Sequence, residues 1–521
     1  MRSLILSGVI VAGLSALLLA RQDLPQLSYV TTANQFGVVG YRDPVGAISP
    51  DGTRLAYTEG RFIRVIPIGG GAPVTLAPGE RQIRYLEWID NTTIAAEDPT
   101  PRARWWRYRI GNAERLPLAA RPQARNPACV AKRRISLKCD GTAVTLDPDR
   151  DVYGPIAFSP DRNTVYFSSP NNQGMVELWS ADLTTRRARR RSNFSRDAYA
   201  PSVASDGTVV FKTQTYRTHL ADVAFEGGPT RQLTTFQSET PSYHPTQPLI
   251  AFTFGTWRRV IDDAKYPDIA QEIGVVDVSK ATPAAQPAEV LEDSDSEDQA
   301  MTWSPNGKWI AFHTHKEMSD DIWLRPADGR QPDRRITFLG RGAEVGWPRW
   351  SPDGKTVLLN GARKSDGASV LYTIGVDQDT GATTSALREI KVAGIAGEMG
   401  HAEWMPGSAS VIALVKEGPG KHAIITVPTT GGRATVVHRY DSEHDFSGLG
   451  VSSNGRFVAY AAPAPDGFFQ IFVKAVGANT PAVRLTTDPS HKTQPAFAPD
   501  GARVAFTVWS YTAAFWAFPG R

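Results

Sequence analysis

The stretch Trp350-Ser351-Pro352-Asp353-Gly354, followed by the apolar run Val357-Leu358-Leu359, decides the fold of this chain. A tight turn is expected at this phrase, because Pro presets φ, Asp bonds back to its own backbone, and Gly takes the left-handed conformation that other residues resist. The apolar run is typical of a half-buried β-strand. The same phrase recurs as Ser49-Pro50-Asp51-Gly52, Ser159-Pro160-Asp161, Ser304-Pro305-Asn306-Gly307 and Ala498-Pro499-Asp500-Gly501. The chain is therefore a repeat protein.

Looser copies of the phrase fill the gaps, at Trp88-Ile89-Asp90-Asn91, Ser205-Asp206-Gly207, His244-Pro245-Thr246-Gln247, Trp404-Met405-Pro406-Gly407 and Ser452-Ser453-Asn454-Gly455. This gives about ten repeat units at a spacing of roughly 40 to 55 residues, the range of β-propeller blades. Most units continue with a third strand, as in Asp321-Ile322-Trp323-Leu324, and often a fourth, as in Arg335-Ile336-Thr337. Four antiparallel strands per unit, without amphipathic helices between them, predict an all-β β-propeller, with a solenoid as the alternative.

The two ends of the chain are expected to pair. The last unit has too few strands, because only Ala514-Phe515-Trp516-Ala517 follows Val504–Thr507 before the end of the sequence. The N-terminal stretch Leu27-Ser28-Tyr29-Val30-Thr31 has no blade of its own. We expect this strand to complete the last blade, which removes open sheet edges.

The phrase, the aromatic residue before it (Trp303, Trp350, Phe158, Phe497) and the Asp-Ile-Trp third strand resemble the repeats of TolB-like propellers, also called PD40 or WD40-like repeats. Similar units occur in the N-terminal propellers of prolyl oligopeptidase and dipeptidyl peptidase relatives. The resemblance covers about Val45 to Thr507 and implies a propeller fold, without fixing a function. A TolB propeller has six blades, so about ten units leave three possibilities: one wide ring, a smaller ring decorated by degenerate copies, or two tandem propellers. The expected pairing of the termini favours a single closure.

The first twenty residues are expected to be a signal peptide. Arg2 is followed by the apolar run Leu4–Ala20, which is short for a membrane span but suits a secretory signal. Residues 21–521 would then form the propeller in the periplasm or outside the cell, with an uncleaved N-terminal anchor as the alternative. No Cys follows Ala20, so no lipoprotein acylation site is expected. The net charge of +4 on 521 residues does not indicate a nucleic-acid partner.

Cys129 and Cys139 are the two cysteines, and they flank a hairpin-like part of an insertion at 119–151. In an exported chain we expect them to form a disulfide, whereas in a cytosolic chain they would be free thiols. Two Cys without a nearby His make a poor zinc site.

Catalytic motifs are absent from the sequence. It has no Gly-x-Ser-x-Gly elbow, no His-Glu-x-x-His pair and no phosphate-binding loop. The hydrolase domain that follows the propeller in the peptidase relatives is also expected to be missing, because the chain ends with its last blade. No catalytic residue is therefore carried over from those enzymes.

Candidate site residues lie in the loops opposite the Ser-Pro-Asp-Gly turns, because the loops that enter the first strand and leave the second strand of each blade share the other face. Those chosen as ligand-binding residues at the channel mouth are Glu297, Asp298, His313, His315, Glu398, His401, His444, Asp445 and His491. The rim also includes Asp151, Tyr153, Tyr199, Glu239, Gln299, Glu344 and Gln494. The densest group joins the acidic run 292–298 to His313, His315 and Glu317, and could hold a divalent cation or a cationic group, or could be a solvated loop.

His401 and His491 are expected to lie just before inner strands. An imidazole there could act as acid or base in a lyase or hydrolase, or could tie neighbouring blades together. The tryptophans of the phrase (Trp88, Trp303, Trp350, Trp404) recur at one blade position and are expected to be core residues.

Three functions follow as hypotheses. The first is an exported, non-enzymatic propeller that binds protein or peptide partners in the cell envelope. The second is an enzyme with its site in the channel, a lyase or hydrolase acting on sugars or peptides. The third is a propeller subunit that assists a separate serine peptidase. No cofactor is expected apart from the possible divalent cation.

Overall fold

A computed structural model of the protein describes residues 24–34, 45–59, 62–79, 83, 85–97, 104–112, 114–121, 129–131, 134–136, 152–170, 176–194, 198–255, 271–291, 298–314, 320–338, 345–363, 365–418, 420–442, 448–465 and 468–520. Within these ranges the secondary structure consists of β-strands, and most strands belong to antiparallel sheets of four. The predicted all-β blade architecture is confirmed. The expected signal peptide at 1–20 lies outside the described residues.

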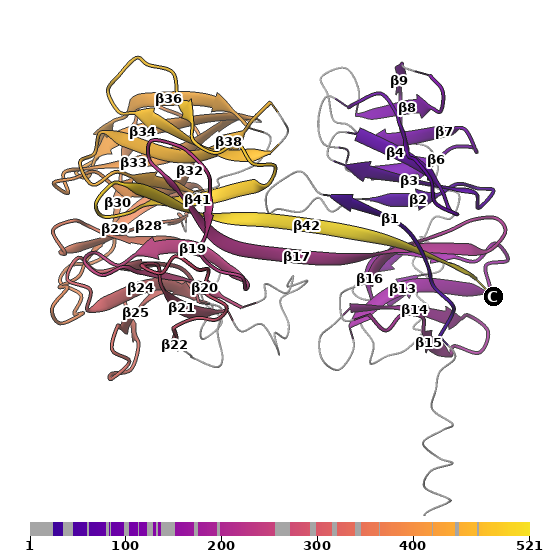
Figure 1. Cartoon of the computed structure of the whole chain (residues 1–521), viewed down its shortest axis with the longest axis horizontal. Coiled ribbons are helices and arrows are strands. Elements are labelled where there is room, and N and C mark those ends of the chain that lie inside the picture. The colour runs from indigo at the N-terminus through magenta and orange to yellow at the C-terminus, as the bar shows by residue number, and fades with distance from the viewer. Residues whose placement is uncertain are drawn as a thin grey trace, which may run out of the picture. The chain divides into compact units, whose positions relative to one another are not determined.

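The chain divides into two compact units. Unit 1 comprises Met1–Gln35, Arg42–Thr215 and Tyr511–Arg521, and unit 2 comprises Phe36–Tyr41 and Tyr216–Ser510. Two long strands, β17 (Thr208–Ala224) and β42 (Arg503–Pro519), contribute residues to both units (Figure 1). This division does not match one wide ring.

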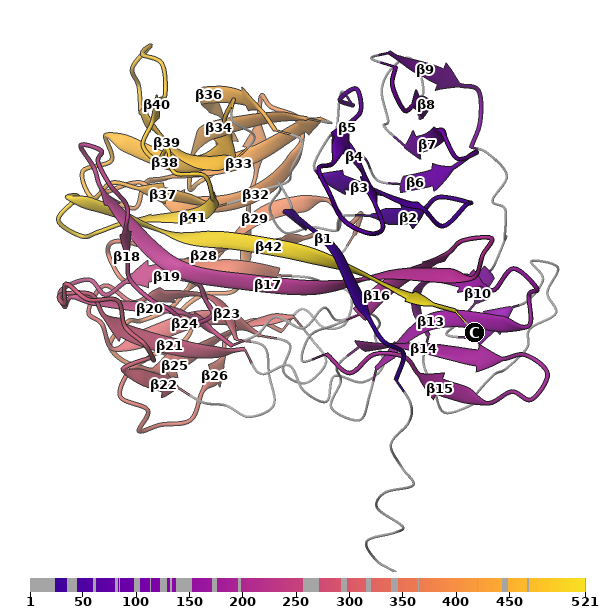
Figure 2. The ribbon, with the colours of Figure 1, turned by 45° about the vertical axis from the view of Figure 1, so that its right-hand side comes forward.

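Unit 1 contains three complete four-stranded sheets, and each sheet follows chain order from its first strand to its last, as β6 to β9 do in Figure 2. The strands are β2 (Gly46–Ile48), β3 (Arg54–Glu59), β4 (Phe62–Pro67) and β5 (Val74–Thr75); β6 (Tyr85–Trp88), β7 (Thr93–Glu97), β8 (Trp105–Arg109) and β9 (Arg115–Leu118); and β12 (Tyr153–Phe158), β13 (Thr164–Pro170), β14 (Val176–Asp182) and β15 (Ala188–Arg190). A fourth sheet takes β16 (Ala198–Val203), the first part of β17, the last part of β42, and β1 (Ser28–Asn34).

A short hairpin, β10 (Cys129–Ala131) paired with β11 (Arg134–Ser136), lies in the predicted insertion at 119–151. Cys139 lies outside the described residues, so the Cys129–Cys139 disulfide stays a prediction.

Unit 2 contains five complete four-stranded sheets and a sixth built from β41, the first part of β42, the last part of β17, and β18. The strands are β18 (Arg231–Gln232), β19 (Ser238–Tyr243), β20 (Leu249–Phe254), β21 (Glu272–Asp277), β22 (Glu289–Leu291), β23 (Gln299–Trp303), β24 (Trp309–Thr314), β25 (Asp321–Pro326), β26 (Arg334–Arg335), β27 (Val345–Trp350), β28 (Thr356–Ala362), β29 (Ser369–Gly375), β30 (Arg388–Ile390), β32 (Glu398–Trp404), β33 (Ser410–Gly418), β34 (Lys421–Pro428), β36 (Thr435–Asp441), β37 (Leu449–Val451), β38 (Phe457–Pro463), β39 (Phe469–Ala475), β40 (Val483–Arg484) and β41 (His491–Phe497). A small parallel pair, β31 (Val392–Ala393) and β35 (Gly432–Arg433), is added beside the sheet of β32, β33, β34 and β36.

The innermost strands of unit 2 close into a ring. Each inner strand contacts the next one in the order β19, β23, β27, β32, β37 and β41. Strand β41 also contacts β19. Unit 2 is therefore a six-bladed β-propeller, and these six strands line its central channel.

The N-terminal strand pairs with the C-terminal strand as expected. Ser28 lies opposite Ala517 and Tyr29 opposite Trp516 in an antiparallel ladder between β1 and β42. Val30 of β1 is buried in a cluster with Phe515 and Ala517. The predicted pairing of the two ends of the chain is confirmed. The sheet that β1 completes contains β16 and the first part of β17, whereas the sheet of β41 is completed by the last part of β17 and β18.

The repeat phrase forms the expected turn, and its serine holds the turn together. The buried Ser351 hydroxyl donates to Asp353 Oδ1 at 2.6 Å and accepts the Thr356 backbone N–H at 3.0 Å. Ser49 makes the same pair of bonds with Asp51 and Arg54, at 2.6 and 3.0 Å. Because the hydroxyl satisfies a backbone N–H that would otherwise be buried without a partner, the phrase specifies the turn as well as permitting it.

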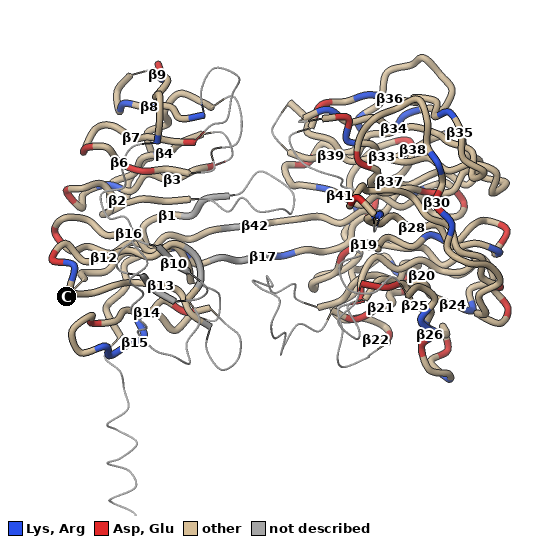
Figure 3. The backbone as a smooth tube through the Cα atoms, turned by 180° about the vertical axis from the view of Figure 1, so that it is seen from behind, with Lys and Arg blue, Asp and Glu red and all other residues tan. Residues whose placement is uncertain are grey.

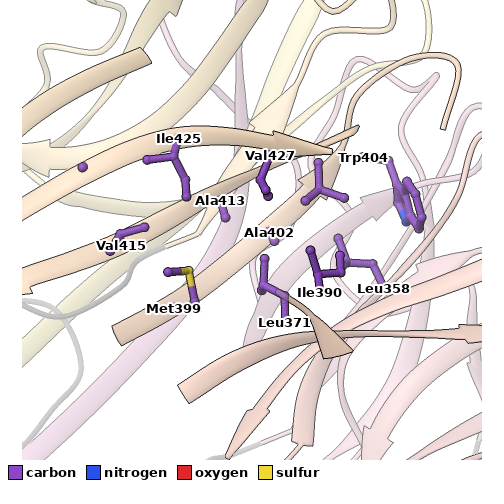
Figure 4. Packing of buried hydrophobic residues seen from close by; sticks show 12 residues of the cluster. Leu358, Leu371, Ile390, Met399, Ala402, Trp404, Ala413, Val415, Ile425 and Val427 are labelled. Carbon is purple, nitrogen blue, oxygen red and sulfur yellow. The ribbon is translucent and has the colours of Figure 1, made fainter. Parts of the chain in front are cut away.

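Apolar side chains fill the space between successive blades, as Figure 4 shows for a cluster that joins β28 and β29 to β32, β33 and β34. The tryptophan of the phrase belongs to this packing, since Trp404 is 7% exposed and lies among Leu358, Ala402 and Val427. Its indole N–H donates to the Arg349 carbonyl of the preceding blade at 2.9 Å. Trp88 and Trp303 donate in the same way to Ala47 and Ser242. The repeated tryptophan is thus a core residue that also joins neighbouring blades.

Candidate functional site

A cavity of about 190 Å³ lies in the channel of unit 2. All six innermost strands contribute to its wall, through Tyr243 of β19, Thr302 of β23, Arg349 of β27, Glu403 of β32, Val451 of β37 and Gln494 of β41, among others. A volume equal to about six water molecules holds one amino-acid-sized group, and is below the range of drug-sized ligand sites.

Four of the six inner strands carry a β-bulge with a left-handed residue, and three of these residues line the cavity. The register of β19, β23, β27 and β41 shifts at one point, and the residue at each shift has a left-handed backbone: Thr240 (φ 54°), Ala300 (φ 53°), Trp347 (φ 54°) and Gln494 (φ 54°). Residues other than Gly, Asn and Asp rarely adopt this conformation, and such bulges often re-aim a side chain. Thr240, Trp347 and Gln494 line the cavity.

An ion pair crosses from one inner strand to the next. The Arg349 Nε donates to Glu403 Oε1 in a short hydrogen bond, and Arg349 Nη1 donates to the carbonyls of Pro348 at 2.8 Å and Ala300 at 3.4 Å. About a fifth of each side chain is exposed. Burial raises the pKa of Glu403, and the Arg349 guanidinium opposes this rise by favouring the charged carboxylate.

His401 is one of two predicted residues that the structure places in the cavity wall, and the other is Gln494 of the wider rim. His401 is 7% exposed, and its ring lies against Trp347 with centroids 3.6 Å apart. Its Nδ1 is buried without a hydrogen-bond partner in the described part of the chain. Burial and the nearby Arg349 charge hold the pKa of His401 well below its usual range, so the imidazole is neutral at pH 7.

Gln494 is held by its carbonyl oxygen. Gln494 Oε1 accepts from Thr507 Oγ1 at 2.7 Å and from the Thr240 backbone N–H at 3.2 Å. Because both contacts use the oxygen, they orient the amide and leave its NH₂ group for an occupant of the channel.

The other predicted residues that the structure describes lie away from this wall. Asp298 is fully buried and forms an ion pair with Arg325 at 2.8 Å. His491 Nδ1 accepts the Phe469 backbone N–H at 3.1 Å, a contact between neighbouring blades. His313 Nε2 lies 3.4 Å from Asp320, and the exposed Glu398 lies 3.9 Å from Lys416.

Four predicted residues, Glu297, His315, His444 and Asp445, lie outside the described ranges, as does Glu317. The suggested cation site at Glu297, His313 and His315 therefore stays a prediction. Among the described residues, no group of three or more His, Cys, Asp or Glu side chains could hold a metal ion.

Sequence reasoning missed Trp347, Arg349 and Glu403, because it searched loops and these residues lie within strands. A signal for them exists. A proline follows the bulge residue at Pro241, Pro348 and Pro495, and the Ser-Pro-Asp-Gly phrase or its looser copy begins a few residues later. Since proline has no N–H to donate, it suits a position where ladder pairing is interrupted.

These features define a class, a β-propeller whose channel carries a small, polar pocket. Neither a family model nor a curated protein matches the chain. Solved structures do: a TolB protein from Agrobacterium tumefaciens is 16% identical, with 57% of this chain and 99% of that chain covered and a TM-score of 0.41. TolB from Acinetobacter baumannii is 14% identical, with 66% and 79% covered and a TM-score of 0.37. The tricorn protease is 12% identical, with 87% and 59% covered and a TM-score of 0.32.

TolB proteins and a peptidase that carries propellers are thus among the structures to which this chain is similar, as the repeat phrase indicates. Likeness at this level concerns architecture, and no activity of those proteins is carried over. In the described ranges no helix is long and apolar enough to cross a membrane.

Proposed function

We propose that this chain is an exported, non-enzymatic propeller that binds a peptide segment of a protein partner in the channel of unit 2. The observation that carries the proposal is the composition of the cavity wall. Trp347, Phe497 and Tyr243 give it apolar area, while Arg349 and Gln494 retain hydrogen-bond donors. Sites for peptides and small ligands combine apolar contact area with placed polar groups, and this wall offers both.

The distribution of charged residues favours recognition in a selective pocket rather than on a broad charged surface. Along the described backbone of unit 2, positions of Lys and Arg alternate with positions of Asp and Glu (Figure 3). A mixed charge pattern of this kind does not favour a polyanion or a polycation as the partner. Recognition is then expected to come from the shape and hydrogen bonding of the channel.

The test uses a random peptide library displayed on phage and selected against the full chain. Selected peptides should lose binding to the variant Trp347→Asn, because Asn tolerates the left-handed backbone but removes the indole wall. The control is Phe338→Asn, since Phe338 is 72% exposed and does not line the cavity. Failure to select any peptide, or equal binding to both variants, would contradict the proposal.

The environment of His401 favours a second candidate, an enzyme with its site in the same cavity. A neutral imidazole whose pKa is lowered, close to a carboxylate whose pKa is raised, is the kind of perturbed pair found at catalytic sites. Turnover of a panel of peptides and oligosaccharides, lost in His401→Gln and retained in His313→Gln, would establish it.

The predicted export has its own measurement. Mass spectrometry of the secreted chain should find an N-terminus near residue 21 and, without reductant, a mass consistent with a Cys129–Cys139 bond. An intact N-terminus at Met1 would indicate the uncleaved anchor instead.

A further inference from the structure

The channel pocket carries no unpaired charge. Among the described residues that line it, Arg349 and Glu403 have a formal charge, and they neutralise each other. A charged group that entered this cavity would lose water without gaining a counter-charge, which is costly. The occupant is therefore uncharged.

The ion pair nevertheless leaves hydrogen-bonding groups of both kinds. The described contacts of Arg349 use its Nε and Nη1 and leave the two N–H groups of Nη2. The contact of Glu403 uses Oε1 and leaves Oε2 as an acceptor. A single group that satisfies both atoms must accept at one end and donate at the other.

Two further groups favour the same occupant. The oriented Gln494 offers its NH₂ as a donor to a carbonyl oxygen. The buried His401 has no hydrogen-bond partner in the described residues. Its imidazole offers a neutral acceptor, because burial lowers the pKa of His401.

We propose that the pocket is an anchor site for one uncharged carboxamide side chain, an Asn or Gln of the bound peptide. Its carbonyl accepts from Arg349, its N–H donates to Glu403, and its aliphatic stem packs on Trp347 and Phe497. The cavity of about 190 Å³ admits one such side chain but not a long stretch of peptide. This inference deepens the proposed peptide-binding function and rests on it.

Three probes of similar size test the inference on the full chain by calorimetric titration at pH 7. They are N-acetyl-glutamine amide, its anionic counterpart N-acetyl-glutamate amide, and N-acetyl-methionine amide, which is neutral but lacks the side-chain amide. The glutamine probe should bind about tenfold more tightly than each of the others, a difference that one satisfied charged hydrogen bond accounts for. Equal binding of all three probes, or no binding, overturns the inference.

The variant Glu403→Gln sharpens the test, because it keeps the shape of the wall and leaves the Arg349 charge unpaired. The preference should invert, so that the glutamate probe binds best. The matched control is Glu417→Gln: Glu417 pairs with Arg439 at 2.9 Å, is exposed to a similar degree at 22%, and belongs to the same blade without lining the cavity. Its probe ranking should equal that of the unchanged chain.

An unchanged ranking in a folded Glu403→Gln protein, or an inverted one in Glu417→Gln, contradicts the inference. If Glu403→Gln does not fold, the ranking on the unchanged chain still decides. The two proposals fail separately. If library peptides bind and the glutamine probe does not, the carboxamide anchor is overturned and the peptide-binding function stands. If the glutamine probe binds and no peptide is selected, the peptide-binding function is overturned and the carboxamide site stands.

Discussion

The buried imidazole of His401 links the channel to protein stability. A histidine without a hydrogen-bond partner among the described residues, packed on an indole, is stable only while it is neutral. The buried environment that keeps His401 neutral therefore also lowers the stability of the folded protein at low pH.

We predict that the free energy of unfolding decreases as the pH falls below about 6.5, the ordinary histidine value, and that His401→Gln reduces this dependence. The sign follows from the lowered pKa of His401 in the folded protein. As the pH falls, His401 binds a proton in the unfolded chain before it does so in the folded chain, which favours unfolding. One such group contributes at most about 1.4 kcal/mol per pH unit. His219, His244 and His438, whose pKa values are also lowered by burial, keep part of the dependence in the variant. Denaturant unfolding at several pH values measures it, and an unchanged slope in His401→Gln would contradict the prediction.

The repeated tryptophans give a residue-scale comparison within one protein. Trp404 donates its indole N–H to Arg349, whereas the indole N–H of Trp350, at the same blade position, has no partner among the described residues. Both side chains are buried to the same degree, at 7% and 6% exposed.

Trp404→Phe should therefore be more destabilising than Trp350→Phe. Both changes leave a similar void, but the first also removes the hydrogen bond to the partly buried Arg349 carbonyl, which contributes about 1 kcal/mol. Chemical denaturation of the two variants gives the difference directly. Equal losses would show that the indole hydrogen bond adds nothing to blade-to-blade packing.

At the scale of the element, the inner strand is defined by its bulge. Ala300 occupies the left-handed position in β23 without any side-chain hydrogen bond to hold it there, while Ala311 of the paired strand β24 lies in a regular ladder. The Cβ of Ala300 causes backbone strain, whereas the Cβ of Ala311 packs in the core.

Ala300→Gly is expected to be neutral or to stabilise the protein by up to about 1 kcal/mol, because glycine adopts the left-handed conformation without steric cost. Ala311→Gly is expected to destabilise it by about 1 kcal/mol, since a strand interior disfavours glycine. The readout is the midpoint of urea unfolding for the two variants. A loss in Ala300→Gly as large as that in Ala311→Gly would mean that the bulge is not strained.

The sequence predicts blades well because their determinants are local. Ser351, Pro352 and Asp353 hold their turn with bonds a few residues long, and the position of Trp404 in the core follows from its recurrence. The site is harder, because Arg349 and Glu403 belong to different blades and each resembles an ordinary alternating strand residue. Rim loops drew attention to Asp298 and His491, which have structural partners. His401 and Gln494 are the described candidates that line the cavity.

At the scale of the whole molecule, the division into units could not be predicted. The phrase Ser-Pro-Asp-Gly is the same at Ser49 in unit 1 and at Ser351 in unit 2, so it specifies a blade but not the unit to which that blade belongs. The strands β17 and β42, with 17 residues each, have residues in both units.

Pairing of the termini gives a prediction at this scale. Val30→Asp should destabilise the protein by several kcal/mol, because Val30 is 4% exposed in the cluster with Phe515 and a carboxylate there has no described partner. Tyr29→Asp, one residue away, should change stability by less than about 1 kcal/mol, since Tyr29 is 55% exposed. Thermal unfolding of both variants is the measurement, and comparable losses would show that β1 contributes little.

The ladder between β1 and β42 also imposes an order on biosynthesis. Ser28 is among the first residues to leave the ribosome, and its partner Ala517 is among the last. Strand β1 therefore has no partner strand β42 during nearly the whole of translation. Tyr216–Ser510 is made in the interval, which allows the six-bladed ring to assemble before its neighbour is complete. Strand β1 is the part of the nascent chain for which a holding chaperone would be most useful.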